Sequence, residues 1–174
     1  MIVYFDTSAF LKLVIAEPGS VTAVGAWTDA DQVAACRLLY PEARAGLAQA
    51  RRMGRLPARA VSASRRTLEA LWVDVEVVEI TPQVARAAGD AAEQHGLRGY
   101  DAVHLVSALH TSADVLVCAD TDLLQAAHAC GLAVIDARTE LEPEQGGGAI
   151  EAAGGLRSLV AGGTCLFGPQ RRPV

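Results

Sequence analysis

Four acidic residues lie at or near the starts of helix-like segments: Asp6, Glu42 and Asp120, which come after apolar, strand-like segments, and Asp101, which comes after the Arg98-Gly99 turn. An ionised carboxylate buried without a partner costs several kcal/mol or is forced neutral. Each of these acids therefore either caps free N–H groups at the start of a helix or holds a cation. Capping explains each acid taken singly, but the set of four has a second interpretation.

Carboxylates that meet at one place repel one another and raise one another's pKa unless a cation neutralises them. Their hard oxygen atoms select Mg²⁺ or Mn²⁺ over zinc. A metal held in this way activates water and stabilises the charge that develops on a phosphate during hydrolysis. The acids therefore predict phosphodiester chemistry, provided that the fold brings them together.

A strongly basic stretch accompanies the acids. Residues 37–66 contain eight arginines and a single acid, so this stretch carries a charge of +7 and the remainder of the chain −12. Two interpretations stay open: a solvated helical face, or a surface that contacts phosphates or an acidic partner. The planar guanidinium group, which grips phosphate or carboxylate through two hydrogen bonds, favours the second.

The elements that would position these residues alternate along the chain. Strands are predicted at residues 2–5, 32–36, 75–80, 115–117 and 132–135. Helices are predicted at residues 7–14, from residue 20 onward, and at 41–53, 57–72, 82–95, 100–110 and 120–130. This alternation predicts an α/β three-layer sandwich, in which helices cover both faces of a central, mostly parallel sheet. Ligands of such sheets bind beyond the carboxyl ends of the strands, where the acids are expected.

Length and composition bound the remaining possibilities. The chain has 174 residues, 51% of them hydrophobic, which predicts one globular domain at residues 1–137. Residues 138–174 are rich in glycine and are expected to form a mobile C-terminal tail. No apolar run is long enough for a membrane span and the start lacks secretory-signal features, so a cytoplasmic protein without a membrane partner is expected.

Four cysteines are scattered along the chain: Cys36, Cys118, Cys130 and Cys165. None of them is part of a CxxC spacing, which argues against zinc sites and disulfides. The helix that begins near residue 20 places Val21, Val24 and Trp27 on one face. Both Trp27 and Trp72 are expected in the core.

Four segments of the chain together resemble the acidic motifs of PIN-domain proteins, most closely those of the VapC-type toxins of toxin–antitoxin pairs. The segments are VYFDTSAFLKL, LLYPEARAGL, LRGYDAVHLVSAL and VLVCADTDLLQAAHACGLAVI, in the order and at roughly the spacing of the family. The resemblance covers residues 2–136. It implies a PIN-like fold and an Mg²⁺- or Mn²⁺-dependent endoribonuclease that cleaves RNA, is inhibited by a cognate antitoxin and commonly forms a homodimer.

Carried over by position, the family's acidic quartet falls on Asp6, Glu42, Asp101 and Asp120, which the resemblance makes metal ligands and catalytic residues. It implies that Asp6 and Asp101 hold the metal most directly, whereas Glu42 and Asp120 complete the ligand set and orient the attacking water. Asp122 aligns with an acid that some relatives carry and is a reserve ligand. The arginine stretch is then expected to contact either substrate phosphates or the antitoxin.

Two positions near the acids need separate interpretation. The family usually has threonine or serine two residues before the fourth acid, where this chain has Cys118, and a thiol is a weak hydrogen-bond partner. Thr7 or Ser8 is expected to supply hydroxyl support instead. His104, one helical turn after Asp101, could be drawn as a general acid, but packing against the first strand is the simpler role.

Other functions are open to different degrees. A HAD-type phosphatase needs a second aspartate where this chain has Ser8, and a late lysine, whereas the only lysine is Lys12. A response-regulator receiver is disfavoured for similar reasons, because it needs an early acidic pair and a late lysine. The serious alternative is a PIN-like module that binds RNA or a partner protein without cutting.

Overall fold

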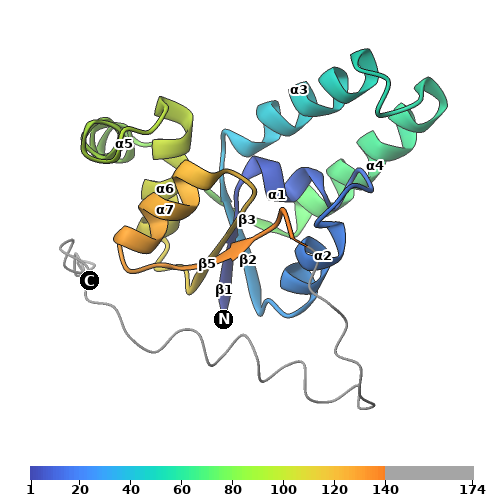
Figure 1. Cartoon of the computed structure of the whole chain (residues 1–174). Helices are drawn as coiled ribbons and strands as arrows, with labels where there is room; N and C mark the ends of the chain where they lie inside the picture. The colour runs from blue at the N-terminus through green and yellow to red at the C-terminus, as the bar shows by residue number, and fades with distance from the viewer. Residues whose placement is uncertain (140–174) are drawn as a thin grey trace.

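A five-stranded parallel sheet forms the centre of the molecule. The computed structural model describes residues 1–139. In sheet order, the strands are β3 (Val75–Val78), β2 (Gln32–Cys36), β1 (Ile2–Phe5), β4 (Val115–Cys118) and β5 (Ala133–Asp136). Every neighbouring pair is parallel, so all five carboxyl ends lie at one edge of the sheet. The predicted three-layer α/β architecture is confirmed (Figure 1).

Helices cover both faces of this sheet. They are α1 (Thr7–Leu11), α2 (Ser20–Thr28), α3 (Leu39–Arg52), α4 (Val61–Val73), α5 (Pro82–His95), α6 (Gly99–His110) and α7 (Thr121–Ala129). A 3₁₀ turn at Ala58–Ala60 leads into α4. The first four helices lie on one side of the sheet and α5, α6 and α7 on the other, as Figure 1 shows.

Alternating side chains of β1 divide the core into two clusters. Val3 and Phe5 belong to the cluster beneath α1–α4, where Phe10 is also fully buried. Tyr4 belongs to the opposite cluster, beneath α5–α7, together with Leu105. Because a central parallel strand is covered on both faces, all of its residues must be apolar or have buried partners. This explains why the acid nearest to it, Asp6, comes only after the strand ends.

Several element ends differ from the prediction, for example the start of α4, which is at Val61 and not at residue 57. The helix predicted to reach residue 14 ends at Leu11, because the backbone N–H groups of Lys12 and Leu13 bond three residues back and tighten the chain into turns. The strand predicted to reach residue 80 ends at Val78, and α3 begins at Leu39, ahead of its proline. None of these shifts moves an acid away from the carboxyl edge of the sheet.

Helix α2 leaves part of its predicted apolar face exposed to solvent. Trp27 packs edge-on against Phe5 and Phe10, as expected for a core residue. Val21 and Val24, however, are 63% and 51% exposed, because α2 turns smaller residues toward the sheet. The apolar face predicted from spacing is therefore only partly a packing face.

Helices α3 and α4 extend beyond the sheet as a pair, which Figure 1 shows at the upper right. Near the sheet, the rings of Tyr40 and Trp72 pack with their centroids 5.5 Å apart, and Leu68 is fully buried. The predicted packing role of Trp72 is thus met at the base of this helical pair.

The chain after β5 remains bonded to the domain as far as it is described. The Arg138 guanidinium group pairs with Asp136 at 2.6 Å, and the Thr22 hydroxyl donates to the backbone oxygen of Thr139 at 2.6 Å. The rest of the tail predicted from residue 138 lies outside the described residues. Within residues 1–139, no helix combines the length and the apolar character that crossing a membrane requires.

Gly19 gives a test of how α2 docks against the end of the sheet. Its φ is +86°, and a Cβ atom there would lie 1.8 Å from the backbone oxygen of Ala137. We expect Gly19→Ala to lower the free energy of unfolding by at least about 1–3 kcal/mol, because left-handed backbone and overlap both oppose a side chain. Denaturant unfolding measures this.

The control is Gly25→Ala, since Gly25 lies within α2 and a Cβ atom there meets nothing within 4 Å. Alanine is the better helix former by about 1 kcal/mol, so this variant is expected to be neutral or more stable. Equal unfolding midpoints for the two variants would contradict the docking described here.

Candidate active site

The carboxyl edge of the sheet gathers the four acids from four separate elements. Asp6 directly follows β1 and Asp120 follows β4, its neighbour in the sheet. Glu42 lies in the first turn of α3 and Asp101 in the first turn of α6. Asp6 and Asp101 are each 5% exposed, whereas the side chains of Glu42 and Asp120 are 25% and 28% exposed. The two more buried acids therefore form the floor of the group.

Asp6 and Asp120 each cap a helix and also face the site. Asp6 Oδ2 accepts the backbone N–H of Ser8 at 2.9 Å, and Asp120 Oδ1 accepts those of Asp122 and Leu123 at 3.0 and 3.1 Å. The second oxygen of each carboxylate points elsewhere, toward the side chains described below. Capping and site formation, which the sequence presents as alternatives, therefore coexist in the same side chains.

His104 connects Asp6 with Glu42. Its Nε2 atom lies 3.0 Å from Glu42 Oε2 and 3.6 Å from Asp6 Oδ1. On the other side of the ring, Nδ1 lies 3.2 Å from the Tyr4 hydroxyl group, which accepts the backbone N–H of Cys36 at 3.0 Å. The imidazole is fully buried against β1, as the packing role predicts, and it also fixes the position of Glu42.

Buried charges shift the titration of this group. Burial alone would lower the pKa of His104, but the Asp6 carboxylate, with contacts to Cys36 and Glu42, outweighs burial and raises it well above its usual value. Burial raises the pKa of Tyr4, so its hydroxyl group stays neutral. His104 therefore offers positive charge to two of the acids without reaching solvent.

Arg98 connects the other two acids and is the site residue that sequence reasoning missed. Its Nε atom donates to Asp101 Oδ2 at 2.7 Å and Nη2 donates to Asp120 Oδ2 at 2.8 Å. The guanidinium group also lies 4.8 Å from the centroid of the Tyr100 ring. The available signal was a basic residue three positions before Asp101, a spacing that puts opposite charges on one side of a helix start.

Hydroxyl groups support the acids where the thiol of Cys118 is weak. Ser8 Oγ donates to Asp6 Oδ2 at 2.5 Å and accepts the backbone N–H of Ala119 at 2.8 Å, while Thr7 Oγ1 donates to Glu42 Oε2. Cys118 Sγ accepts the N–H of Asp120 at 3.0 Å and lies 3.5 Å from Asp6 Oδ2. Burial raises the pKa of the thiol, so it remains a neutral donor to Asp6. Both Thr7 and Ser8 thus serve as expected.

The acids influence one another electrostatically. Burial raises the pKa of Asp101; Arg98 lowers it, and the nearby charges of Asp120 and Asp6 raise it again, so that it lies above its ordinary value. Asp122 only donates its backbone N–H to Asp120, and no contact of its carboxylate is found among residues 1–139. Its predicted role as a reserve ligand thus gains no support from contacts.

The donor atoms suit a hard divalent cation, although they are not arranged as a ready-made cage. Within residues 1–139, no group of three or more His, Cys, Asp or Glu side chains has the geometry to hold a metal as it stands. The guanidinium group of Arg98 pairs with the carboxylates of Asp101 and Asp120, and the His104 ring pairs with the carboxylate of Glu42. Glu42 Oε1 and Asp101 Oδ1 accept no hydrogen bond from the described residues, which leaves carboxylate oxygens for an ion such as Mg²⁺ or Mn²⁺.

The chain is similar to known proteins of one family. The PIN domain family matches residues 3–129. The chain is 43% identical over 141 residues to Ribonuclease VapC49 of Mycobacterium tuberculosis (strain ATCC 25618 / H37Rv) and to Ribonuclease VapC45 of strain CDC 1551 / Oshkosh. The alignment covers 80% of this chain and 98% of each relative.

Solved structures share the fold. PAE2754 from Pyrobaculum aerophilum superposes with a TM-score of 0.59 at 24% identity, covering 77% of this chain and 83% of that one. A toxin–antitoxin complex from Klebsiella pneumoniae includes a chain with a TM-score of 0.56 at 17% identity, covering 79% and 99%. The family match spans all four acids at the carboxyl edge. The chain therefore belongs to the PIN domain family, on the branch that includes the two VapC ribonucleases.

Proposed function

We propose that this protein is a metal-dependent endoribonuclease that acts as the toxin of a toxin–antitoxin pair. The observation that carries the proposal is the linked series of acids at the sheet edge. Glu42 and Asp6 share His104, and Asp101 and Asp120 share Arg98. Membership of a branch whose 43% identical relatives are named ribonucleases supports the same activity.

Asp6 and Asp101, with Glu42 and Asp120, would hold Mg²⁺ or Mn²⁺. When bound, such an ion activates water and stabilises the charge that develops on the phosphate. Asp6 is held in place by two hydrogen bonds from Ser8, one from its backbone N–H group and one from its hydroxyl group. Glu42 is held by Thr7 and His104, and together with Asp120 it would orient the attacking water.

The partners form part of the same proposal. A cognate antitoxin is supported by the fold, which also occurs in the Klebsiella toxin–antitoxin complex. The homodimer is proposed from the resemblance to VapC-type toxins alone. An RNA substrate follows from the ribonuclease relatives and from the hydrolytic chemistry of the acids. A cytoplasmic location belongs to the same proposal, since cellular RNA is present there.

The first test compares the wild-type chain, free of antitoxin, with Asp6→Asn. Purified protein is incubated with total RNA of its own host and Mn²⁺, and metal binding is followed by calorimetry. We expect cleavage by the wild type and at least about a 100-fold lower rate for Asp6→Asn, because a ligand charge is lost while the shape is kept. Metal binding is expected to weaken in parallel.

Asp90→Asn removes an acid from the exposed side of α5 and is the matched control, with wild-type cleavage expected. If the wild type binds Mn²⁺ and RNA but cuts none of the RNA supplied, the non-cleaving PIN-like module is the correct interpretation. If it binds no metal, the acidic edge does not have the function proposed.

Arg98 gives a prediction about metal binding that can be tested without cleavage of RNA. Because its guanidinium group occupies Asp101 and Asp120, a metal ion competes with it for these carboxylates. Arg98 is 60% exposed, so each pair is worth at most about 1 kcal/mol. We expect Arg98→Gln to tighten the Kd for Mn²⁺ roughly fivefold.

Calorimetry without RNA measures this effect. The control is Arg55→Gln, which breaks an arginine–glutamate pair with Glu17 and should leave the Kd for Mn²⁺ unchanged. Weaker binding by Arg98→Gln would show instead that the guanidinium group helps to assemble the site.

Asp101 gives a pH-dependent prediction for the metal-free protein. A carboxyl group whose folded-state pKa is raised stabilises the fold below its ordinary pKa, and this stability is lost as pH rises through the raised value. Asn is neutral throughout. We therefore expect Asp101→Asn to melt a few degrees above the wild type near neutral pH in EDTA, with the difference vanishing in acid.

Thermal unfolding across the acid-to-neutral range provides the measurement, and Asp90→Asn again serves as the control for loss of one charge. If the difference in melting temperature between Asp101→Asn and the wild type stays constant with pH, titration of Asp101 is excluded as its cause.

A further inference from the structure

A cavity of about 550 Å³ lies between α3 and α4, away from the acids. Its lining residues are Arg44, Leu47, Ala48, Arg51, Arg52, Val61 and Arg65. The five from α3 lie at relative positions i, i+3, i+4, i+7 and i+8, so they form a single stripe along that helix. The two from α4 are one turn apart and face this stripe across the cavity. We call this feature the arginine cavity.

Most of the positive charge in the arginine cavity is unneutralised. Arg44 donates to the Tyr40 hydroxyl group at 2.8 Å and pairs with Glu69 at 3.3 Å. In contrast, Arg51, Arg52 and Arg65 make no ion pair with any residue from 1 to 139. Elsewhere in the described part, Arg37, Arg55, Arg98 and Arg138 pair with acids, whereas no ion pair is found for Arg59, Arg66 or Arg86.

Helix electrostatics explains only part of this clustering. Arg51 and Arg52 lie in the last turn of α3, where the negative end of the helix dipole favours cations by about 0.3–1 kcal/mol. Arg65 lies in the N-terminal half of α4, where the dipole offers a cation no such gain. Its convergence with the α3 arginines therefore adds repulsion that neither a pairing nor a dipole offsets. An anionic ligand would offset it.

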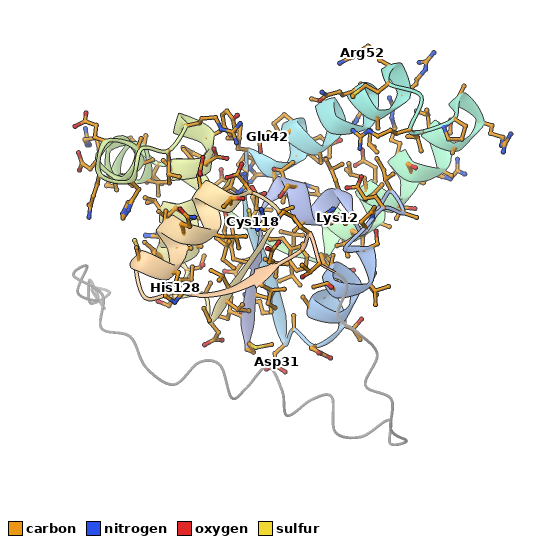
Figure 2. All side chains as sticks on the ribbon, viewed as in Figure 1. Lys12, Asp31, Glu42, Arg52, Cys118 and His128 are labelled. Atoms are coloured by element: carbon orange, nitrogen blue, oxygen red, sulfur yellow. The ribbon has the colours of Figure 1, made fainter. Side chains whose placement is uncertain are left out.

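The position of the arginine cavity indicates which kind of anion it would bind. Glu42 and Arg52 lie at opposite ends of α3, as Figure 2 shows, and ten residues of helix separate them by about 15 Å. Without a bound metal, the acidic edge repels phosphate groups, so a neighbouring positive surface would add affinity for a polyanion. A nucleic-acid strand that passes the acids and continues along α3 meets the arginine cavity next.

The lining also indicates how such a strand would be bound. Between the arginines the wall is apolar, formed by Leu47, Ala48 and Val61, and no aromatic residue belongs to the lining. It therefore offers neither an aromatic platform for stacking bases nor side-chain amides for reading their edges. A guanidinium group can also contact a guanine edge, but several of them along two facing helices match the repeated charge of the phosphate backbone, and phosphate contacts carry no sequence information.

We propose that the arginine cavity binds phosphates of the RNA substrate beyond the cleavage site, contributing affinity without sequence preference. This inference rests on the proposed ribonuclease function, because it assumes that RNA lies across the acids. It assigns the arginines of the cavity to the substrate, where the sequence left substrate and antitoxin open.

The test measures RNA binding separately from cleavage. Full-length protein carrying Asp101→Asn is titrated in EDTA with fluorescent single-stranded RNA of random sequence, between about 50 and 200 mM salt. Arg51→Ala with Arg65→Ala is added to this background. We expect weaker binding for every RNA tested and a log–log salt slope smaller by about 1.4, because each phosphate of a single strand that is no longer neutralised removes roughly 0.7.

Arg59→Ala with Arg66→Ala is the matched control, since it removes two exposed arginines of the same stretch that do not line the cavity. Its salt slope is expected to match that of the background protein. Unfolding curves check that both double variants fold. An unchanged slope for Arg51→Ala with Arg65→Ala, or equal slope losses in the two variants, would overturn the proposal.

Two further outcomes keep this inference separate from the proposed function. In the cleavage assay without Asp101→Asn, Arg51→Ala with Arg65→Ala should raise KM and leave kcat unchanged, because these guanidinium groups bind RNA equally before and during the reaction. If nothing is cut, the binding assay still decides the role of the cavity. If poly-glutamate needs Arg51 and Arg65 for binding while RNA does not, the cavity takes an acidic protein partner and the RNA proposal fails.

Discussion

The parallel pairing of β1 with β4 is the constraint on which the site depends. It sets Phe5 beside Val117, and the backbone N–H of Asp6 continues the ladder by donating to Val117 at 3.0 Å. The chain leaves both strands at the same edge, so Asp6 and Asp120 begin their helices side by side. Antiparallel pairing would send one of them to the opposite edge. The other two acids arrive on helices that pack over these strands.

The protein offsets the repulsion of this arrangement with two cations of its own. His104 supplies charge from the buried side and Arg98 from the solvent side. At Asp101 burial, with a smaller contribution from Asp120 and Asp6, outweighs Arg98, so the pKa of this carboxyl group stays above its ordinary value. Residues that destabilise the metal-free fold in this way are typical of sites retained for function.

The sequence predicted what depends on local pattern. The parallel architecture followed from alternating strands and helices, and the positions of Asp6 and Asp120 followed from the ends of apolar runs. Arg98 was missed because its role depends on Asp120, which lies 22 residues further along the chain. Only the folded structure brings the two side chains within hydrogen-bond distance. The exposure of Val21 was also missed, since periodicity shows which residues share a helix face but not whether that face is covered.

The double use of Asp6 and Asp120 has a consequence for order within the site. Because one oxygen of each carboxylate is bound into a helix start, folding itself selects the rotamer that presents the other oxygen. Side-chain entropy at these positions is therefore lost when the chain folds, not when a ligand binds. Fraying of the first turn of α1 or α7 releases the corresponding carboxylate. Local unfolding at either helix end would therefore disorder part of the acidic edge.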